Sequence, residues 1–75
     1  MYYPGKAIVE ALRADYPIGC RVELISMSDV HAPPEGTRGT VMCVDDAATV
    51  HVAWDNGSSL GVVYDVDFIR RIQDN

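Results

Sequence analysis

An alternating run that ends in an Asn-Gly pair constrains the fold of this 75-residue chain more than any other feature. In "TVHVAW", residues 49–54, every second residue is large and apolar, which predicts a strand with both inner valines and Trp54 on one face. The Asn56-Gly57 pair that follows favours a two-residue type I′ turn, with positive φ at both positions. We therefore predict a β-hairpin whose second strand is "SLGVV", residues 59–63.

Three further runs extend this hairpin into an antiparallel sheet. "CRVELI" and "TRGTVMCV" alternate in a similar way, so that Val22 and Leu24 share one face, and "FIRRI" supplies a fifth strand near the C-terminus. Gly39 interrupts the second of these runs and indicates a bulge, a bend or the close approach of another backbone.

A short helix is predicted ahead of the strands, within "GKAIVEALRAD" at residues 5–15. Its apolar face is expected to carry Ala7, Ile8, Ala11 and Leu12. The fold class is therefore mainly β: an N-terminal amphipathic helix at residues 1–17, followed by a small five-stranded SH3-like antiparallel barrel at residues 18–73.

Charge argues against a polyanionic partner. Eleven acidic and six basic side chains give a formal net charge of −5, which opposes binding to nucleic acid. An arginine patch with aromatic stacking groups is the alternative, and its members would be Arg21, Arg38, Arg70, Arg71, Tyr2, Tyr3, Tyr16 and Trp54. These arginines can instead pair with acidic neighbours, namely Glu23, Asp65 and Asp67.

The candidate reactive groups do not form a recognisable centre. Cys20 and Cys43 lie in predicted strands, where we expect reduced, buried thiols. Cys43 could face His51 across neighbouring strands, but a strand pair offers neither oxyanion donors nor a cleft. Zinc sites begin with two ligands a few residues apart, and no such pair occurs here. We expect no enzymatic activity, no metal and no cofactor.

The expected binding surface combines a long loop with the hairpin. The loop "SMSDVHAPPEG", residues 26–36, breaks every periodicity and presents apolar side chains next to two prolines. Burial of Trp54 in the core is the alternative to its exposure in a groove. The predicted binding residues are Met27, Val30, His31, Pro33, Pro34, Trp54, Asp55, Asn56 and Ser58.

Four segments carry a resemblance to a known family: "YPIGCRVELISM", "PEGTRGTV", "VDDAATVHVAWDNGSSLGVV" and "VDFIRRI". Over residues 16–72 the chain resembles domain of unknown function family 4314, small proteins of bacterial genomes and of mobile or phage-derived elements. The strand layout is also similar to the mind-bomb/HERC-type domain and other SH3-like barrels, which implies a protein-interaction module. The chain departs from those barrels by carrying "SDVHAPPE" where they have an aromatic-rich insert.

The expected function is thus a small non-enzymatic protein-interaction module, an accessory protein of bacterial or phage origin. A nucleic-acid-associated factor that uses the arginine patch is the first alternative. A self-associating protein, in which the N-terminal helix pairs between copies, is the second. No apolar run approaches the roughly 18–20 residues that span a membrane, so we expect a cytoplasmic location and no membrane partner.

Overall fold

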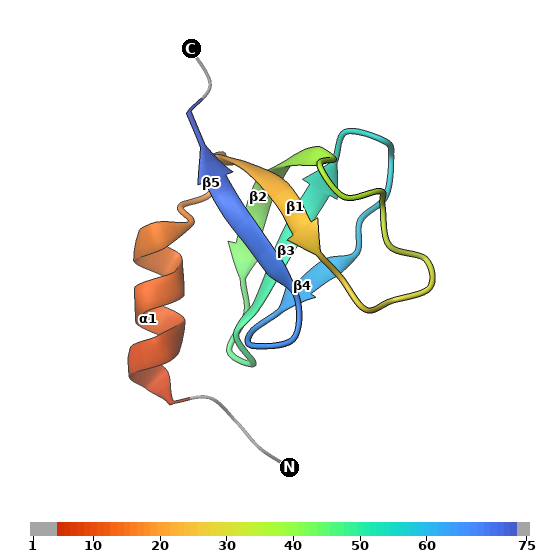
Figure 1. The fold of residues 1–75 in the computed structure, drawn as a ribbon. Helices are drawn as coiled ribbons and strands as arrows, with labels where there is room; N and C mark the ends of the chain where they lie inside the picture. The colour runs from red at the N-terminus through yellow and green to blue at the C-terminus, as the bar shows by residue number, and fades with distance from the viewer. Residues whose placement is uncertain (1–4, 74–75) are drawn as a thin grey trace.

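The computed structural model describes residues 5–73 and has one helix and five strands. The elements are α1 (Lys6–Asp15), β1 (Arg21–Ser26), β2 (Arg38–Val44), β3 (Thr49–Trp54), β4 (Gly61–Val63) and β5 (Phe68–Ile72). Neighbouring strands are antiparallel, and their order in the sheet is β4-β3-β2-β1-β5 (Figure 1). The predicted mainly β fold with a short N-terminal helix is confirmed.

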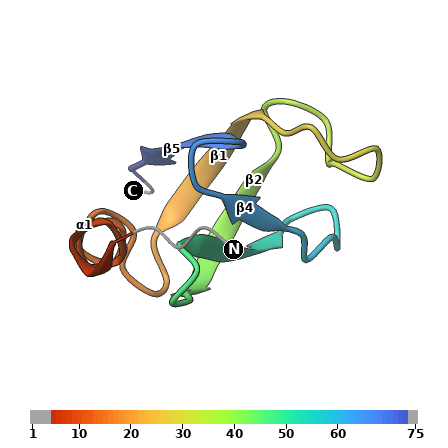
Figure 2. The same cartoon turned by 90° about the horizontal axis from the view of Figure 1, so that it is seen from below.

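The sheet is strongly bent but does not close into a barrel. Its edge strands, β4 and β5, come from opposite ends of the strand order and face each other across the bend (Figure 2). Within residues 5–73 no strand pairing joins them. We name this opening between β4 and β5 the seam.

The inward faces of the strands form the core. Val22 and Leu24 in β1 are 0% and 1% exposed, while Arg21 and Glu23 point to the other face, as the alternation predicted. β3 buries Val50, Val52 and Trp54 in the same way. Burial of this aliphatic surface is the main force that holds the sheet in its bent shape.

Gly39 marks a close approach between β2 and β3, one of the three interpretations open from the sequence. A Cβ atom at this position would lie 2.5 Å from Val52 Cγ1, 2.9 Å from Trp54 Cε3 and 2.9 Å from the carbonyl oxygen of Ala53. Real Cβ atoms essentially never show such distances, so glycine is what allows Val52 and Trp54 to lie this close to β2.

A bulge in β2 overturns one prediction. The register between β2 and β3 shifts between Val41 and Cys43, so Met42 is an extra residue on the β2 side. Val44 therefore takes the next inward position and Cys43 points outward. The prediction that Cys43 is buried is wrong for this reason, whereas Cys20 is half-buried.

The hairpin between β3 and β4 differs from the predicted two-residue turn. Gly57 has φ of 93°, but Asn56 is not among the described residues with positive φ, so the type I′ prediction is wrong. The N–H of Gly57 donates to Trp54 O and the N–H of Trp54 donates to Ser58 O, both at 2.9 Å. This pattern is a three-residue loop in which glycine takes the left-handed position of a bulge.

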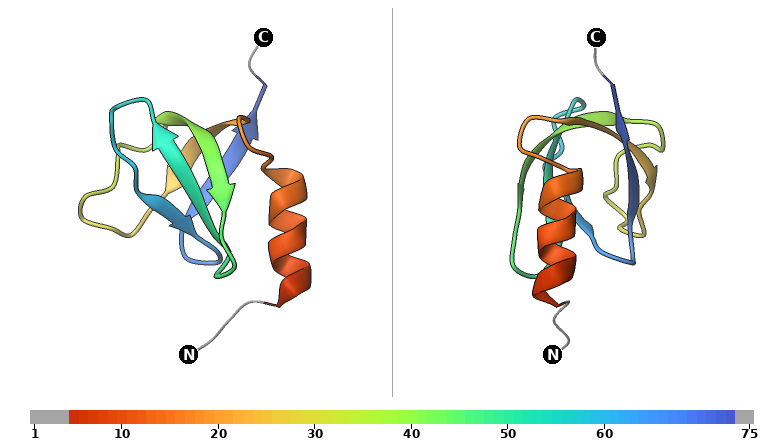
Figure 3. Two further views of the ribbon diagram at one scale, coloured as in Figure 1. Left: turned by 180° about the vertical axis from the view of Figure 1, so that it is seen from behind. Right: turned by 90° about the vertical axis from the view of Figure 1, so that its left-hand side faces the viewer.

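Helix α1 packs against the sheet through a stripe centred on Val9, which is 5% exposed. Ile8 and Leu12 flank it on the core, while Ala7 and Ala11 are exposed, so the predicted face is wrong at the two alanines. The helix lies beside the bent sheet between β2 and β5 (Figure 3). Its apolar stripe is thus used within the chain.

Candidate functional site

The 26–36 loop is anchored at its base and exposed at its tip. Of the predicted binding residues, Met27 is half-buried against the core and Pro33 is buried. Val30 is 93% exposed, and His31 and Pro34 are also exposed. A turn at the tip is held by the N–H of His31, which donates to the Asp29 carboxylate at 2.7 Å.

The hairpin turn lies on the same side of the molecule as this loop, away from α1 (Figures 1 and 3). Its Asp55 carboxylate accepts a hydrogen bond from Arg21 at 2.8 Å, which lowers the pKa of Asp55 below its usual value. Asn56 Oδ1 accepts the N–H of Ser58, which is half-buried. The Asp55 carboxylate and the Asn56 amide oxygen are therefore already bonded inside the chain.

Trp54 belongs to the core and not to a groove. Its side chain is 3% exposed, and its indole N–H donates to Leu60 O at 2.9 Å. The sequence left two placements for Trp54, in a groove or in the core, and the structure has it in the core. Without this indole, the surface formed by the loop and the turn has no aromatic side chain in the described part of the chain.

An apolar pocket of about 200 Å³ opens instead at the seam. Its walls come from α1, β3, β4, the turn after β4, and β5: Leu12, Tyr16, Val50, Val62, Tyr64 and Phe68. Tyr64 is 41% exposed and Phe68 is 51% exposed, so both rings border the opening. Burial raises the pKa of the Tyr16 hydroxyl, a group that is uncharged at neutral pH even at its ordinary pKa.

Asp67 seals the edge of β4 beside this pocket. The residue is 8% exposed, and its carboxylate accepts the N–H of Val63 at 3.0 Å and that of Ser28 at 3.2 Å. The carbonyl of Val63 accepts the N–H groups of Val66 and Asp67. Both outward backbone groups of Val63 are thus satisfied by its own turn, and the 26–36 loop is tied to the seam.

Asp65 lines the same pocket without such partners. It sits at the turn with φ of 65°, a left-handed geometry that aspartate tolerates better than most residues. In the described part of the chain its carboxylate makes no hydrogen bond or ion pair. The expected pairing of Asp65 and Asp67 with arginines is therefore wrong, and the pocket has one free acidic group at its mouth.

The outer face of the sheet carries a row of alternating charges. Glu23 lies opposite Arg38 on β2 and Arg70 on β5, with nitrogen–oxygen distances of 3.8 and 3.2 Å. Arg71 instead donates to the carbonyl of Asp15 at the end of α1. Trp54 is buried and Tyr16 lies in the seam pocket, while Tyr2 and Tyr3 fall outside the described residues. Of the proposed stacking groups, the two that the structure describes, Trp54 and Tyr16, therefore do not join the arginines on the outer face.

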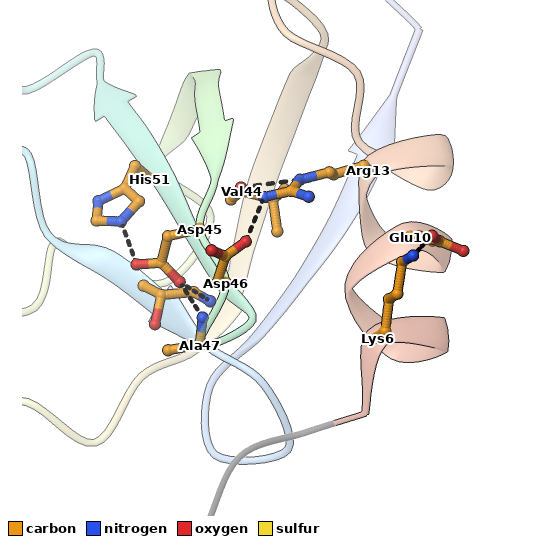
Figure 4. A network of polar contacts seen from close by, with 9 residues as sticks. Lys6, Glu10, Arg13, Val44, Asp45, Asp46, Ala47 and His51 are labelled. Atoms are coloured by element: carbon orange, nitrogen blue, oxygen red, sulfur yellow. Dashed lines mark hydrogen bonds and ion pairs between the residues drawn. The ribbon is translucent and has the colours of Figure 1, made fainter.

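A polar cluster surrounds the turn between β2 and β3. Asp45 accepts hydrogen bonds from His51 Nε2 at 2.8 Å and from the N–H groups of Ala47 and Thr49 (Figure 4). These bonds, with that of His51 foremost, lower the pKa of Asp45. Cys43 is the cross-strand partner of His51, as the sequence suggested. No group of three His, Cys, Asp or Glu side chains within residues 5–73 could hold a metal ion.

A second cleft, of about 340 Å³, lies between the end of α1 and β2 and includes Cys43. Its charged lining residue, Arg13, already donates to the carbonyl of Val44 at 2.8 Å and to Asp46 at 3.2 Å (Figure 4). These contacts fasten α1 to the sheet. In this cleft the Arg13 guanidinium is thus engaged in structural contacts, whereas the Asp65 carboxylate at the seam pocket has no partner in the described chain.

Sequence reasoning missed the seam residues Tyr64, Asp65 and Phe68. The motif "YDVDF" that contains them gave one local signal, an acidic turn with an aromatic residue on either side. Periodicity assigned Phe68 to a strand correctly, but it does not reveal which strands form the two edges of a sheet. The pocket exists because β4 and β5 are those edges.

These features define a small open-sheet β domain with a helix packed on one side and an apolar pocket at its seam. The chain belongs to the family described as Domain of unknown function (DUF4314), whose model matches residues 5–72. The match includes α1, which the resemblance drawn from the sequence had left out. Searches of curated proteins and of solved structures find no match to the chain. Among the described helices, none has the length and apolar character needed to cross a membrane.

Proposed function

We propose that the protein is a small non-enzymatic interaction module that binds a partner protein at the seam pocket. The observation that carries this proposal is the pair of half-exposed rings, Tyr64 and Phe68, beside an apolar cavity of about 200 Å³. Pockets for drug-sized molecules are larger, roughly 300–1,000 Å³. A cavity of this size suits one anchoring side chain of a larger partner, with the rings as its contact surface.

The seam is a better candidate than the surface formed by the 26–36 loop and the hairpin turn. Partner proteins are held mainly by aromatic and aliphatic groups that lose water on binding. The loop offers Val30 at its tip, but Trp54 is buried and Asp55 is already bonded to Arg21. The seam offers exposed Tyr64 and Phe68 together with a cavity. We place the module in the cytoplasm, as an accessory protein of a bacterium or a mobile element.

Nucleic-acid binding is the second candidate, and one observation favours it. Arg38 and Arg70 share the single carboxylate of Glu23 on the outer face of the sheet, so that row keeps a net positive charge. Phosphate contacts from such a face would give binding that weakens steeply with salt. The net charge of −5 opposes this role over the molecule as a whole.

Affinity capture with three versions of the tagged protein tests the proposal. Wild type, Phe68→Ser and Val30→Ser are compared in a bacterial lysate, after circular dichroism and thermal melts show that all three fold. Both variants replace an exposed apolar side chain, one at the seam and one on the loop. We expect a specific protein to be retained by wild type and Val30→Ser and lost with Phe68→Ser.

The opposite pattern, loss with Val30→Ser alone, would move the site to the loop. Retention that disappears after nuclease treatment and falls in an Arg70→Gln variant would favour the second candidate. A protein retained equally by all three versions would contradict both proposed protein-binding surfaces.

A further inference from the structure

The charges around the seam pocket indicate what kind of side chain it accepts. The charged residues that line it are Asp65 and Asp67, and neither lysine nor arginine lines it within residues 5–73. The Asp67 oxygens accept the N–H groups of Val63 and Ser28, whereas the Asp65 carboxylate has no partner in the described chain. An apolar cavity with a single free anion at its mouth is complementary to a group with an apolar stem and a cationic head.

We infer that the seam pocket binds a lysine or arginine side chain of the partner protein. This inference rests on the proposed function and names the chemistry of the group that enters the same site. The methylene stem would lie against the aliphatic wall formed by Val50 and Val62, and the head would reach the Asp65 carboxylate. Lysine and arginine are the two side chains that combine such a stem with a head that is positively charged at neutral pH.

The aromatic walls strengthen the case for a cation over a purely apolar group. Three rings line the pocket, those of Tyr16, Tyr64 and Phe68. The face of an aromatic ring attracts ammonium and guanidinium groups through its quadrupole. A second source of attraction is the net charge of −5, which favours the approach of a basic partner over an acidic one. An anionic side chain would meet repulsion from Asp65 and gain nothing from the rings.

Blocked five-residue peptides test this assignment on the full chain by nitrogen-15 NMR. The central residue is arginine, lysine, norleucine or glutamate, between two leucines, so that the probes differ in one side chain. We expect the arginine and lysine peptides to shift the amides of residues 64–69 and to bind about 3- to 30-fold more tightly than the norleucine peptide, from one exposed ion pair and one cation–π contact. The glutamate peptide should shift none of these amides.

Two matched variants assign the preference to Asp65. Asp65→Asn removes the charge but keeps a residue that tolerates positive φ, and it should lower the preference for arginine over norleucine to the part that the cation–π contact supplies, about 2- to 5-fold. Glu35→Gln removes the same unit of charge from the exposed 26–36 loop and should leave the preference unchanged. Free butylammonium and ethylguanidinium test whether the pocket binds any small cation. If it binds a protein side chain, these two cations should shift the seam amides less than the peptides do.

The outcomes separate this inference from the proposed function. Equal seam shifts with norleucine and arginine peptides would overturn the cationic assignment while leaving the seam as a binding site. Shifts that are as large with free amines as with peptides would overturn the assignment to a protein side chain. No seam shift with any peptide at millimolar concentration, combined with unchanged protein capture by Phe68→Ser, would overturn the inference and the proposed function together.

Discussion

Replacement of Asp67 by alanine is expected to destabilise the protein by about 3 kcal/mol, because its carboxylate holds two backbone N–H groups. Hydrogen bonds to an ionised acceptor contribute roughly 1.5–3 kcal/mol each. Ser28 is exposed, so in the variant its N–H can hydrogen-bond to water. We therefore take the lower value, about 1.5 kcal/mol, for each of the two bonds. Asparagine keeps one acceptor oxygen, and Asp67→Asn should therefore cost about 1.5 kcal/mol.

Urea unfolding followed by Trp54 fluorescence measures these costs, since the indole is buried in the folded protein. With a slope of about 1 kcal/mol/M for a small domain, the midpoint should fall by about 3 M for Asp67→Ala and about 1.5 M for Asp67→Asn. Asp65→Asn removes the same charge two residues away, at an unpaired carboxylate, and its midpoint should stay within about 0.3 M of wild type. Equal midpoints for Asp67→Ala and wild type would refute the assigned role.

Three further changes probe the turns and the β2–β3 contact, all by urea unfolding. Gly39→Ala should cost about 2–3 kcal/mol, because the Ala53 carbonyl cannot move away from the new methyl group; a cost below about 0.5 kcal/mol would contradict this. Gly57→Val should cost about 1–3 kcal/mol at φ of 93°, and clearly more than Gly57→Asn. Asp45 has a lowered pKa, so its contribution is present above the usual aspartate pKa of about 3.9 and is lost as the pH falls through the folded value. The midpoint difference between wild type and Asp45→Asn should therefore shrink on acidification; a constant difference would contradict the assignment.

Alternation predicted the strands well because each inward position is filled by a large apolar side chain. Val22 and Leu24 in β1, and the valines of β3, follow the period of two over their whole length. β2 departs from it where Met42 is inserted, and nothing in "TVMCV" distinguishes that bulge from regular alternation. The exposure of Cys43 was unpredictable for this reason.

The turn and the helix show how local patterns underdetermine geometry. An Asn-Gly pair fits a two-residue turn or, as here, a three-residue loop with glycine alone at positive φ. The predicted helix face, which included Ala7 and Ala11, differs from the observed face around Val9 by a rotation of about one residue, roughly 100°. Packing against the sheet selects Val9, because it buries more apolar surface than alanine does.

The seam could not be predicted because it depends on contacts between distant parts of the chain. Asp67 lies 39 residues from Ser28, and only the folded sheet brings its carboxylate to the 26–36 loop. Phe68 and Tyr16 meet at one pocket although they belong to β5 and to the end of α1. Residue types in this region predict a strand and a turn, but they do not predict the strand order that places these residues around one pocket.

The way in which the seam is sealed limits the binding modes open to the proposed partner. An exposed sheet edge normally invites another strand to pair with its free N–H and C=O groups. At β4 both outward groups of Val63 are taken by the turn that ends at Asp67. Strand addition at Val63 would have to break three internal hydrogen bonds before it formed any. The recognition proposed for the seam would therefore depend on side chains entering the pocket, and its proposed selectivity on Asp65, the lining carboxylate that no contact within residues 5–73 engages.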